Sequence, residues 1–483
     1  MRLRWRRRQF HPARFAAVGV SYSFAFTLPA DTDVYALADQ LLREEVAQGA
    51  NMPPSTKVRV NPNFRKALRN RQFLEGMTEI PRLVTGELKI TAWARKYPRA
   101  AIYAMRHRLI RVNPFSRRQA DRDALSEEAQ AFFDRLKEPV HDIDKSIVDS
   151  TKVLGALTAT DADLFSPIYL RKSPFVRLEL RSFAAKSPML ADEEILATLL
   201  LHRSGVALMT FYTVVGSNRS ADELLRSSIS REALLETTTF PGTVIGAAEP
   251  AHEVDTDDWV EPNVGTVPDR RIKWASNFSI TDAFWVYRDR IDWMTGKRSE
   301  GHRDYFCYTT VMIDGLQCCD DRSSWLEMHS QELAGLAMRV PSYGKFDAKT
   351  ALDALPKDYS IYGTESRYYY GSNALIVEWD FTPKNNLCPS FVDMISTVAV
   401  VEHALLQYWQ IHSLDDQLSI SSQTGGGLSR VQRRLAEGIE EYRASSISYG
   451  SAQEIADSIM ALLRANNLHQ RLLERLAMMA LRS

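Results

Sequence analysis

Hydrophobic periodicity changes near Pro389, and this change divides the chain into two architectural parts. Before Pro389, two kinds of segment alternate along the chain. In one, apolar and polar residues alternate, as in strands; in the other, apolar residues recur at helical spacing. A chain that mixes the two periods in this way predicts an α/β or α+β fold, with helices flanking a mixed sheet. The predicted strands are 18–28, 177–183, 206–215, 304–314 and 366–381, the last broken by a turn at 371–373, and the predicted helices are 31–46, 192–202 and 221–228.

After Pro389 the pattern is helical throughout. Residues 391–418 form one long predicted helix, residues 421–427 a flexible connection, and residues 428–483 resume with apolar residues spaced alternately by four and three. That spacing makes a narrow apolar stripe, which is typical of helical hairpins and coiled coils. We therefore expect a C-terminal stalk-like region that forms a homo-oligomer through Val431, Leu435, Ile439, Tyr442, Ile455, Ile459, Leu462, Leu472, Leu476 and Met479.

These patterns predict three domains. Residues 1–125 form a basic N-terminal α/β portion, residues 126–388 an α/β domain, and residues 389–483 the helical region. Within the second, residues 241–268 contain four prolines, six acidic residues and no Lys or Arg, which is typical of an exposed loop or linker.

Charge is distributed unevenly although the formal net charge is zero. Residues 1–122 hold 24 Lys and Arg against 9 Asp and Glu, and residues 51–122 alone hold 17 against 4. Such a surface fits an acidic surface of the same protein, anionic lipid or nucleic acid. For nucleic acid, Trp93 and Tyr97 are the aromatic residues placed to stack on bases, and the cations predicted to bind it are Arg65, Lys66, Arg69, Arg71, Arg95, Lys96 and Arg99.

The cysteine content and the hydropathy of the chain indicate its cellular compartment and whether it spans a membrane. Four cysteines in 483 residues, two of them adjacent at positions 318 and 319, are typical of a reducing compartment, so we expect a cytoplasmic protein. The most apolar helical stretch, 391–409, contains Asp393, Glu402 and His403. A membrane-spanning helix needs about 20 nearly uncharged residues, so this stretch predicts a core helix.

The order of parts resembles the cytosolic half of the CorA-like divalent-cation transporters. The similarity covers residues 196–483: the strands near 205–215 and 368–380, the helices that follow, and the stretch 443–448 before Gln453. The resemblance implies a sensing domain joined to stalk helices, with Mg²⁺ as the cation. The family's Gly-Met-Asn pore motif and membrane helices are absent, so transport is expected only if this sequence is a fragment of a longer transporter.

Candidate chemistry is sparse. His252, Asp255, Asp257 and Asp258 form an oxygen-rich group of the kind that binds Mg²⁺ or Ca²⁺. The chain has no G-x-S-x-G, H-E-x-x-H or P-loop motif, although catalytic groups scattered in sequence leave an enzyme open as an alternative. We therefore expect a non-enzymatic, oligomeric regulatory or interaction protein of the cytoplasm, with nucleic-acid binding through residues 51–122 as the alternative.

Overall fold

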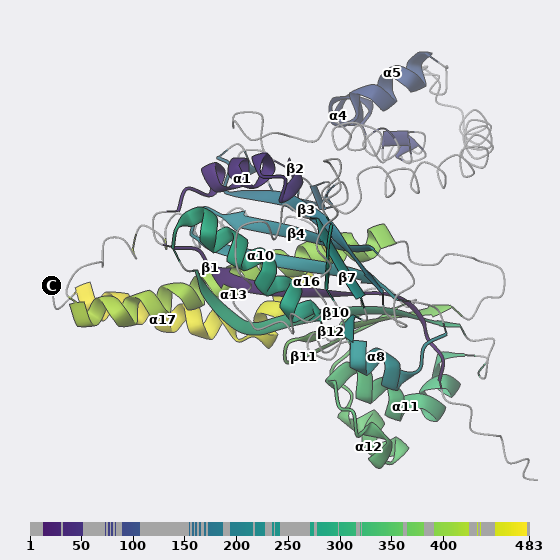
Figure 1. The fold of residues 1–483 in the computed structure, drawn as a ribbon. Helices are drawn as coiled ribbons and strands as arrows, with labels where there is room; N and C mark the ends of the chain where they lie inside the picture. The colour runs from purple at the N-terminus through teal and green to yellow at the C-terminus, as the bar shows by residue number, and fades with distance from the viewer. Residues whose placement is uncertain are drawn as a thin grey trace, which may run out of the picture. The chain divides into compact units, whose positions relative to one another are not determined.

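A computed structural model gives the fold (Figure 1). The chain comprises two compact units, the first made of Met1–Arg59 and Thr160–Ser483 and the second of Val60–Ala159. The structure describes residues 13–29, 32–51, 73, 76–77, 79–80, 83, 89–106, 154, 157–158, 160–161, 164–165, 169–170, 172–186, 194–215, 218–227, 234–235, 237–241, 271–274, 278–297, 299–314, 319, 321–360, 365–380, 391–424, 432, 435 and 450–480.

A mixed sheet is the centre of the first unit. Among the described residues it has ten strands, in the order β11-β12-β10-β1-β5-β4-β3-β7-β8, with β2 paired to β3. The pair β10–β12 is parallel, whereas β1 lies antiparallel between β10 and β5. The strands are β1 Ala16–Thr27, β2 Ala47–Asn51, β3 Phe175–Lys186, β4 Glu194–His202, β5 Val206–Val214, β7 Thr237–Pro241, β8 Arg271–Trp274, β10 Glu300–Asp314, β11 Glu365–Tyr370 and β12 Asn373–Asp380.

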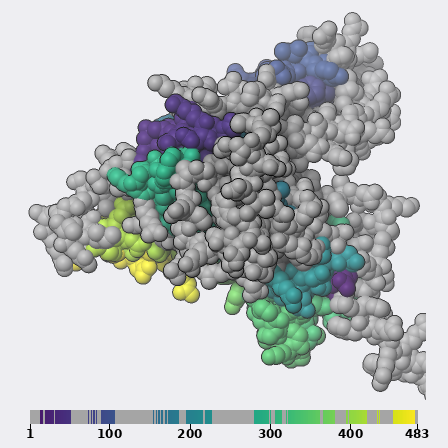
Figure 2. All heavy atoms as spheres, in the orientation of Figure 1, coloured from purple at the N-terminus to yellow at the C-terminus, as the bar shows by residue number. Residues whose placement is uncertain are grey.

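Helices cover both faces of this sheet, and Figure 1 shows α10 in front of it and α13 behind. Two of them, α1 and α10, lie side by side on the visible surface in Figure 2 and are joined by an ion pair between Arg290 and Glu44 at 3.0 Å. A short ribbon, β6 Leu234–Leu235 with β9 Phe278–Ser279, precedes α10. The helices of this unit are α1 Val34–Arg43, α8 Ala221–Ser227, α10 Ile280–Thr295, α11 Arg322–Met338, α12 Ala348–Ala354, α13 Phe391–Thr424, α16 Gly450–Leu462 and α17 Ala465–Ala480.

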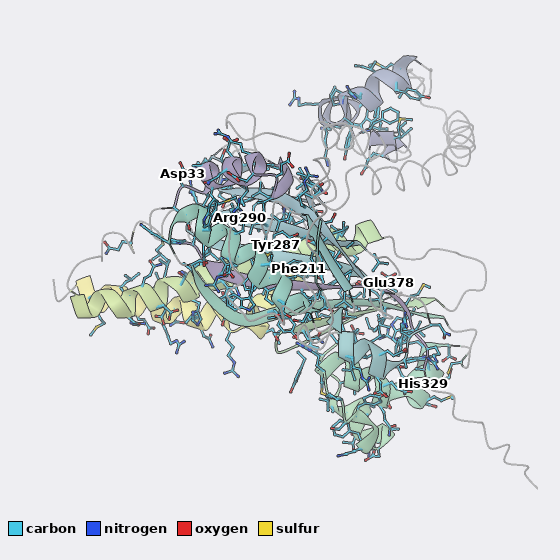
Figure 3. All side chains as sticks on the ribbon, in the orientation of Figure 1. Asp33, Phe211, Tyr287, Arg290, His329 and Glu378 are labelled. Atoms are coloured by element: carbon cyan, nitrogen blue, oxygen red, sulfur yellow. The ribbon has the colours of Figure 1, made fainter. Side chains whose placement is uncertain are left out.

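The sheet face toward α10 is apolar and aromatic. Phe24 of β1 stacks on Phe284 of α10 with ring centroids 4.6 Å apart and also meets Phe211 of β5 edge to face. Tyr287, one turn further along α10, lies beside Phe211, as Figure 3 shows. Buried aromatic pairs add to the stability gained from burying their area, so this face is the main hydrophobic core of the unit.

The opposite face, toward α13, is buried but polar. Side chains two residues apart share a face of a strand, so Arg177 and Glu179 of β3 point the same way, as do Thr210 and Tyr212 of β5. Ser23 of β1 shares a hydrogen bond of 2.9 Å with Thr210. All of these side chains are buried. Because buried polar groups need hydrogen-bond partners, the helix that covers this face must supply polar side chains to pair with them.

Gly19 lets α13 approach β1 closely. A Cβ at this position would lie 2.8 Å from the carbonyl oxygen of Thr213 and 3.0 Å from Met394 Sδ of α13. We expect Gly19→Ala to lower the free energy of unfolding by about 1–3 kcal/mol, because a packed interface cannot take up the extra volume without shifting. Chemical denaturation measures this, with Gly344→Ala as the control, since nothing lies within 4 Å of a Cβ at Gly344. Equal effects of the two substitutions would contradict the close approach.

The second unit is a small helical core. Its described helices are α4 Ile90–Lys96 and α5 Pro98–Arg106. Trp93 is buried and its indole nitrogen donates to the carbonyl oxygen of Gly76 at 2.8 Å. Tyr97, between the helices, is buried as well. The alanines of α5 pack against these two rings: Ala100, Ala101 and Ala104.

The fold class predicted from the sequence is confirmed: a mixed sheet with flanking helices is followed by C-terminal helices. Two element predictions are wrong: the expected helix 192–202 is strand β4, and residues 421–424, expected to belong to a flexible connection, are the last residues of α13. The two compact units have other boundaries than the three predicted domains: β1 lies in the middle of the sheet, and α13 packs on β1 and β5. Of the acidic loop 241–268, only Pro241, the end of β7, belongs to the described residues.

Candidate functional site

A cluster of four charged or ionisable side chains lies between the polar face of the sheet and α13. It consists of Asp161, Arg177 of β3, and Glu402 and His403 of α13, all buried, and we call it the buried charge cluster. Arg177 points to this side because its strand alternates, with Val176 and Leu178 facing the apolar core. Glu402 and His403 are adjacent on α13, so one turn of that helix presents both to the sheet region.

Arg177 is the centre of the cluster. Its Nε donates to Asp161 Oδ2 at 2.8 Å and its Nη2 to Asp161 Oδ1 at 3.0 Å, which is the paired geometry that a planar guanidinium and a carboxylate favour. Its Nη1 donates to Glu402 Oε2. The other oxygen of Glu402, Oε1, accepts from the hydroxyl of Tyr212 on β5 at 3.1 Å. One arginine of β3 therefore joins Asp161 to Glu402 of α13.

The distances define the role of His403. Its Nε2 lies 2.7 Å from Asp161 Oδ1 and 3.4 Å from Arg177 Nη2. A carboxylate only accepts and a guanidinium only donates, so Nε2 cannot satisfy both partners. The shorter contact assigns the hydrogen to Nε2, which donates to Asp161. The ring itself lies edge-on to Phe165, with centroids 4.7 Å apart, and beside Phe175 at 5.1 Å.

Burial and charge act against each other on the acids and bases of the cluster. Burial alone would raise the pKa of Asp161, but the charge of Arg177 and the hydrogen bond from His403 outweigh it and lower that pKa to about 2. Burial would lower the pKa of Arg177, yet Asp161 and Glu402 raise it above its ordinary value. Burial, reinforced by the negative charge of Glu402, raises the pKa of the Tyr212 hydroxyl. Arg177 and Asp161 are therefore a charged pair at neutral pH.

A second histidine borders the cluster at the end of β4. The Nδ1 atom of His202 accepts from the backbone N–H of Ser204 at 3.1 Å and lies 2.9 Å from the Ser204 hydroxyl. Burial, together with the nearby charges of Arg203 and His403, lowers the pKa of His202 to about 3. His202 is thus neutral in the folded protein at neutral pH.

This arrangement provides an ion-pair contact between α13 and the sheet. The guanidinium of Arg177 occupies the position between the carboxylates where a cation would neutralise them, and within the described part of the chain no group of three or more His, Cys, Asp or Glu can hold a metal ion. Buried ion pairs contribute little net stability, but removal of one partner is costly because it leaves a charge buried. The cluster therefore connects α13 to β3 and β5 through Glu402.

The predicted oligomerisation residues fall on helices that pack within one chain. Both α16 and α17 contact α13. Leu462 and Met479 are half-buried, and Val431, Ile439 and Tyr442 lie outside the described residues. The buried members of the predicted set are Leu435, Ile455, Ile459, Leu472 and Leu476. These five described members of the stripe are thus covered within one chain, and assembly through the stripe stays a prediction.

The predicted nucleic-acid residues are only partly described. Arg95, Lys96 and Arg99 are exposed on α4 and α5. Trp93 and Tyr97, expected to stack on bases, are instead buried in the core of the second unit. The remaining predicted cations, Arg65, Lys66, Arg69 and Arg71, lie outside the described residues. So do all four members of the predicted metal site, His252, Asp255, Asp257 and Asp258.

The sequence contained part of the signal for the buried charge cluster. Glu402 and His403 interrupt the most apolar helix of the chain, and a charged residue in such a position needs a buried partner. Arg177 interrupts an apolar strand in the same way. Nothing in the sequence pairs these residues with each other or with Asp161, because 225 positions separate Arg177 from Glu402.

No protein-family model, curated protein or solved structure matches this chain. Among the described residues, no helix is both long and apolar enough to cross a membrane.

Proposed function

We propose that the protein is a non-enzymatic interaction protein of the cytoplasm that assembles with copies of itself through its C-terminal helices. The observation that carries this proposal is that α17 presents apolar side chains on two faces. Leu473 and Met478 are 41% and 54% exposed on a helix whose other face is buried within the chain. The resemblance to CorA-like stalk helices agrees with assembly through this region.

One face of α17 is used inside the chain. Leu468, Leu472 and Leu476 recur at intervals of four and are buried. Arg475 forms an ion pair with Asp415 of α13 and donates to Ser419 at 3.0 Å. These contacts fix the rotation of α17 about its own axis, so the other face is directed away from α13.

That other face has the spacing of a second helix contact. Gln470, Leu473 and Ala477 are exposed and separated by three and four residues. Met478, five positions after Leu473, is exposed at a point about 140° further around the helix and is not part of this stripe. Such a narrow stripe fits one facing helix, and a second copy of α17 offers a matching stripe. The buried charge cluster supports the same function, because a helix held in one position on the sheet presents α16 and α17 to a partner in a defined orientation.

Two of the four cysteines support the cytoplasmic location. Cys307 and Cys319 are buried free thiols in the described structure. Burial raises the pKa of the Cys307 thiol, which keeps it protonated and unreactive. Free thiols kept inside a fold are typical of a protein that works in a reducing compartment.

Light scattering after size exclusion tests the assembly. We expect the purified chain to be an oligomer and Leu473→Glu to shift it to the monomer, because a charge in the stripe cannot be buried against a second copy. Leu352→Glu on α12 is the matched control, since Leu352 is equally exposed, at 44%, and lies on another helix. A monomeric wild-type chain, or an oligomer that Leu473→Glu leaves intact, would sink the proposal.

A further inference from the structure

We infer that the second unit docks on an anionic lipid surface through the exposed face of α5. The inference is independent of the C-terminal assembly, because it rests on residues of Val60–Ala159 alone. Three observations carry it: the apolar residues that α5 exposes, the cations around them, and the burial of the aromatic residues that another partner would need.

The exposed face of α5 is apolar at its centre. Ile102 and Met105 are 61% and 60% exposed, and they lie three positions apart, so both are on one side of the helix. The small side of α5 is turned inward, where its alanines pack against Trp93 and Tyr97. Tyr103 is half-buried and packs against Phe73, so the apolar side chains that α5 leaves exposed are Ile102 and Met105. A pair of large exposed apolar residues on one side of a helix marks a surface that a partner can cover.

Three exposed cations precede this apolar pair on α4 and α5. Arg99 is exposed and lies three positions before Ile102, on the same side of α5. Arg95 and Lys96 are exposed at the end of α4. The two helices together, Ile90–Lys96 and Pro98–Arg106, contain four basic residues and no acidic one. Exposed apolar residues bordered by cations complement an anionic bilayer, in which headgroup charge lies directly above hydrocarbon.

Nucleic acid fits this surface less well. Single-stranded nucleic acid is bound by stacking its bases on exposed aromatic rings. Trp93 and Tyr97 are buried, and the indole nitrogen of Trp93 is bonded to Gly76. Tyr103 is half-buried, with its ring against Phe73 at 5.2 Å. The exposed apolar side chains of α5 are Ile102 and Met105, which offer no planar surface for a base but can enter the acyl region of a bilayer.

Co-sedimentation of the full-length chain with vesicles tests the inference. We expect binding to vesicles of phosphatidylcholine with 30% phosphatidylglycerol and little binding to pure phosphatidylcholine. The triple variant Arg95→Gln/Lys96→Gln/Arg99→Gln should bind the anionic vesicles at least about tenfold more weakly, through lost electrostatic attraction. Ile102→Ser/Met105→Ser should weaken binding about tenfold as well, and this loss should persist at high salt, where screening removes the charge contribution.

Matched controls distinguish binding through α4 and α5 from non-specific binding of the protein to vesicles. The variant Lys345→Gln/Lys349→Gln removes two exposed cations of the first unit, and Leu352→Ser removes an exposed apolar side chain of the same unit. Neither variant should bind vesicles differently from the wild type. Equal binding by every variant, or no binding to anionic vesicles, overturns the inference. Binding of a single-stranded oligonucleotide that depends on Arg95, Lys96 and Arg99, without vesicle binding, overturns it in favour of nucleic acid.

Discussion

Replacing Arg177 by methionine is expected to lower the free energy of unfolding by about 3–5 kcal/mol. The substitution leaves Asp161 and Glu402 buried, negatively charged and without their shared cation. A buried carboxylate that loses its partner must be protonated or exposed to water, and either change costs stability. Since native domains are stable by only about 5–15 kcal/mol, this one change removes a large part of the total.

Urea denaturation followed by circular dichroism measures this loss. Arg43→Met is the control, because Arg43 is an exposed arginine paired with Asp39 four positions earlier on α1, and such surface pairs contribute less than about 1 kcal/mol. The triple variant Asp161→Asn/Arg177→Met/Glu402→Gln should recover part of the lost stability, because no unpaired charge remains buried. Similar losses for Arg177→Met and Arg43→Met would show that the buried charge cluster does not anchor α13.

Hydrogen exchange on the same variant locates the effect. The cluster joins α13 to β3 and β5, so amides of α13 should exchange faster in Arg177→Met by a larger factor than amides of β1 and β10. A uniform increase in exchange rate across the unit would mean instead that the cluster stabilises the whole fold and not the contact of α13 in particular.

The sequence predicts local structure well where one face of an element is polar. The strand at 18–28 alternates visibly and becomes β1, and the turn at Gly371, whose φ is 58°, separates β11 and β12 as expected. The stretch 192–202 misleads because β4 is buried on both faces, with Leu199 toward the apolar core and Thr198 and Leu200 toward the other side. A continuous apolar run has no period of two, so it cannot be distinguished from a buried helix.

Long-range pairing could not be predicted. Glu402 and His403 are informative as charged residues in an apolar helix, but the sequence alone only excludes that helix from a membrane. Their partner Arg177 is more than 200 positions away. The sequence also does not show which face of a helix is buried. Spacing identifies Leu472 and Leu476 as one stripe, but only the packing of α17 on α13 shows that this stripe is buried and that Leu473 is exposed.

Acid is expected to destabilise the fold through His202, at about 1.4 kcal/mol per pH unit below pH 6.5. Burial and the neighbouring charges of Arg203 and His403 lower the pKa of His202 from 6.5 to about 3 in the folded chain. Between these values the unfolded chain binds a proton that the folded chain does not. The contribution is therefore complete above pH 6.5 and declines as pH falls, by about 3 kcal/mol at pH 4. Asp161 acts separately, because its pKa falls from 3.8 to about 2 on folding and its contribution is lost only below pH 3.8.

Unfolding free energies measured from pH 7 to pH 4 test this dependence. His202→Asn keeps an acceptor for the N–H of Ser204 and cannot take up a proton, so its stability should vary less with pH than that of the wild type, by the contribution of one proton. His412→Asn on α13 is the matched control for the loss of a histidine, because His412 is half-exposed beside Asp416 and is not buried as His202 is. If His202→Asn retains the full wild-type slope, the acid response belongs to other groups. A flattened slope would show that acid destabilises the fold through the uptake of a proton by His202 at the end of β4.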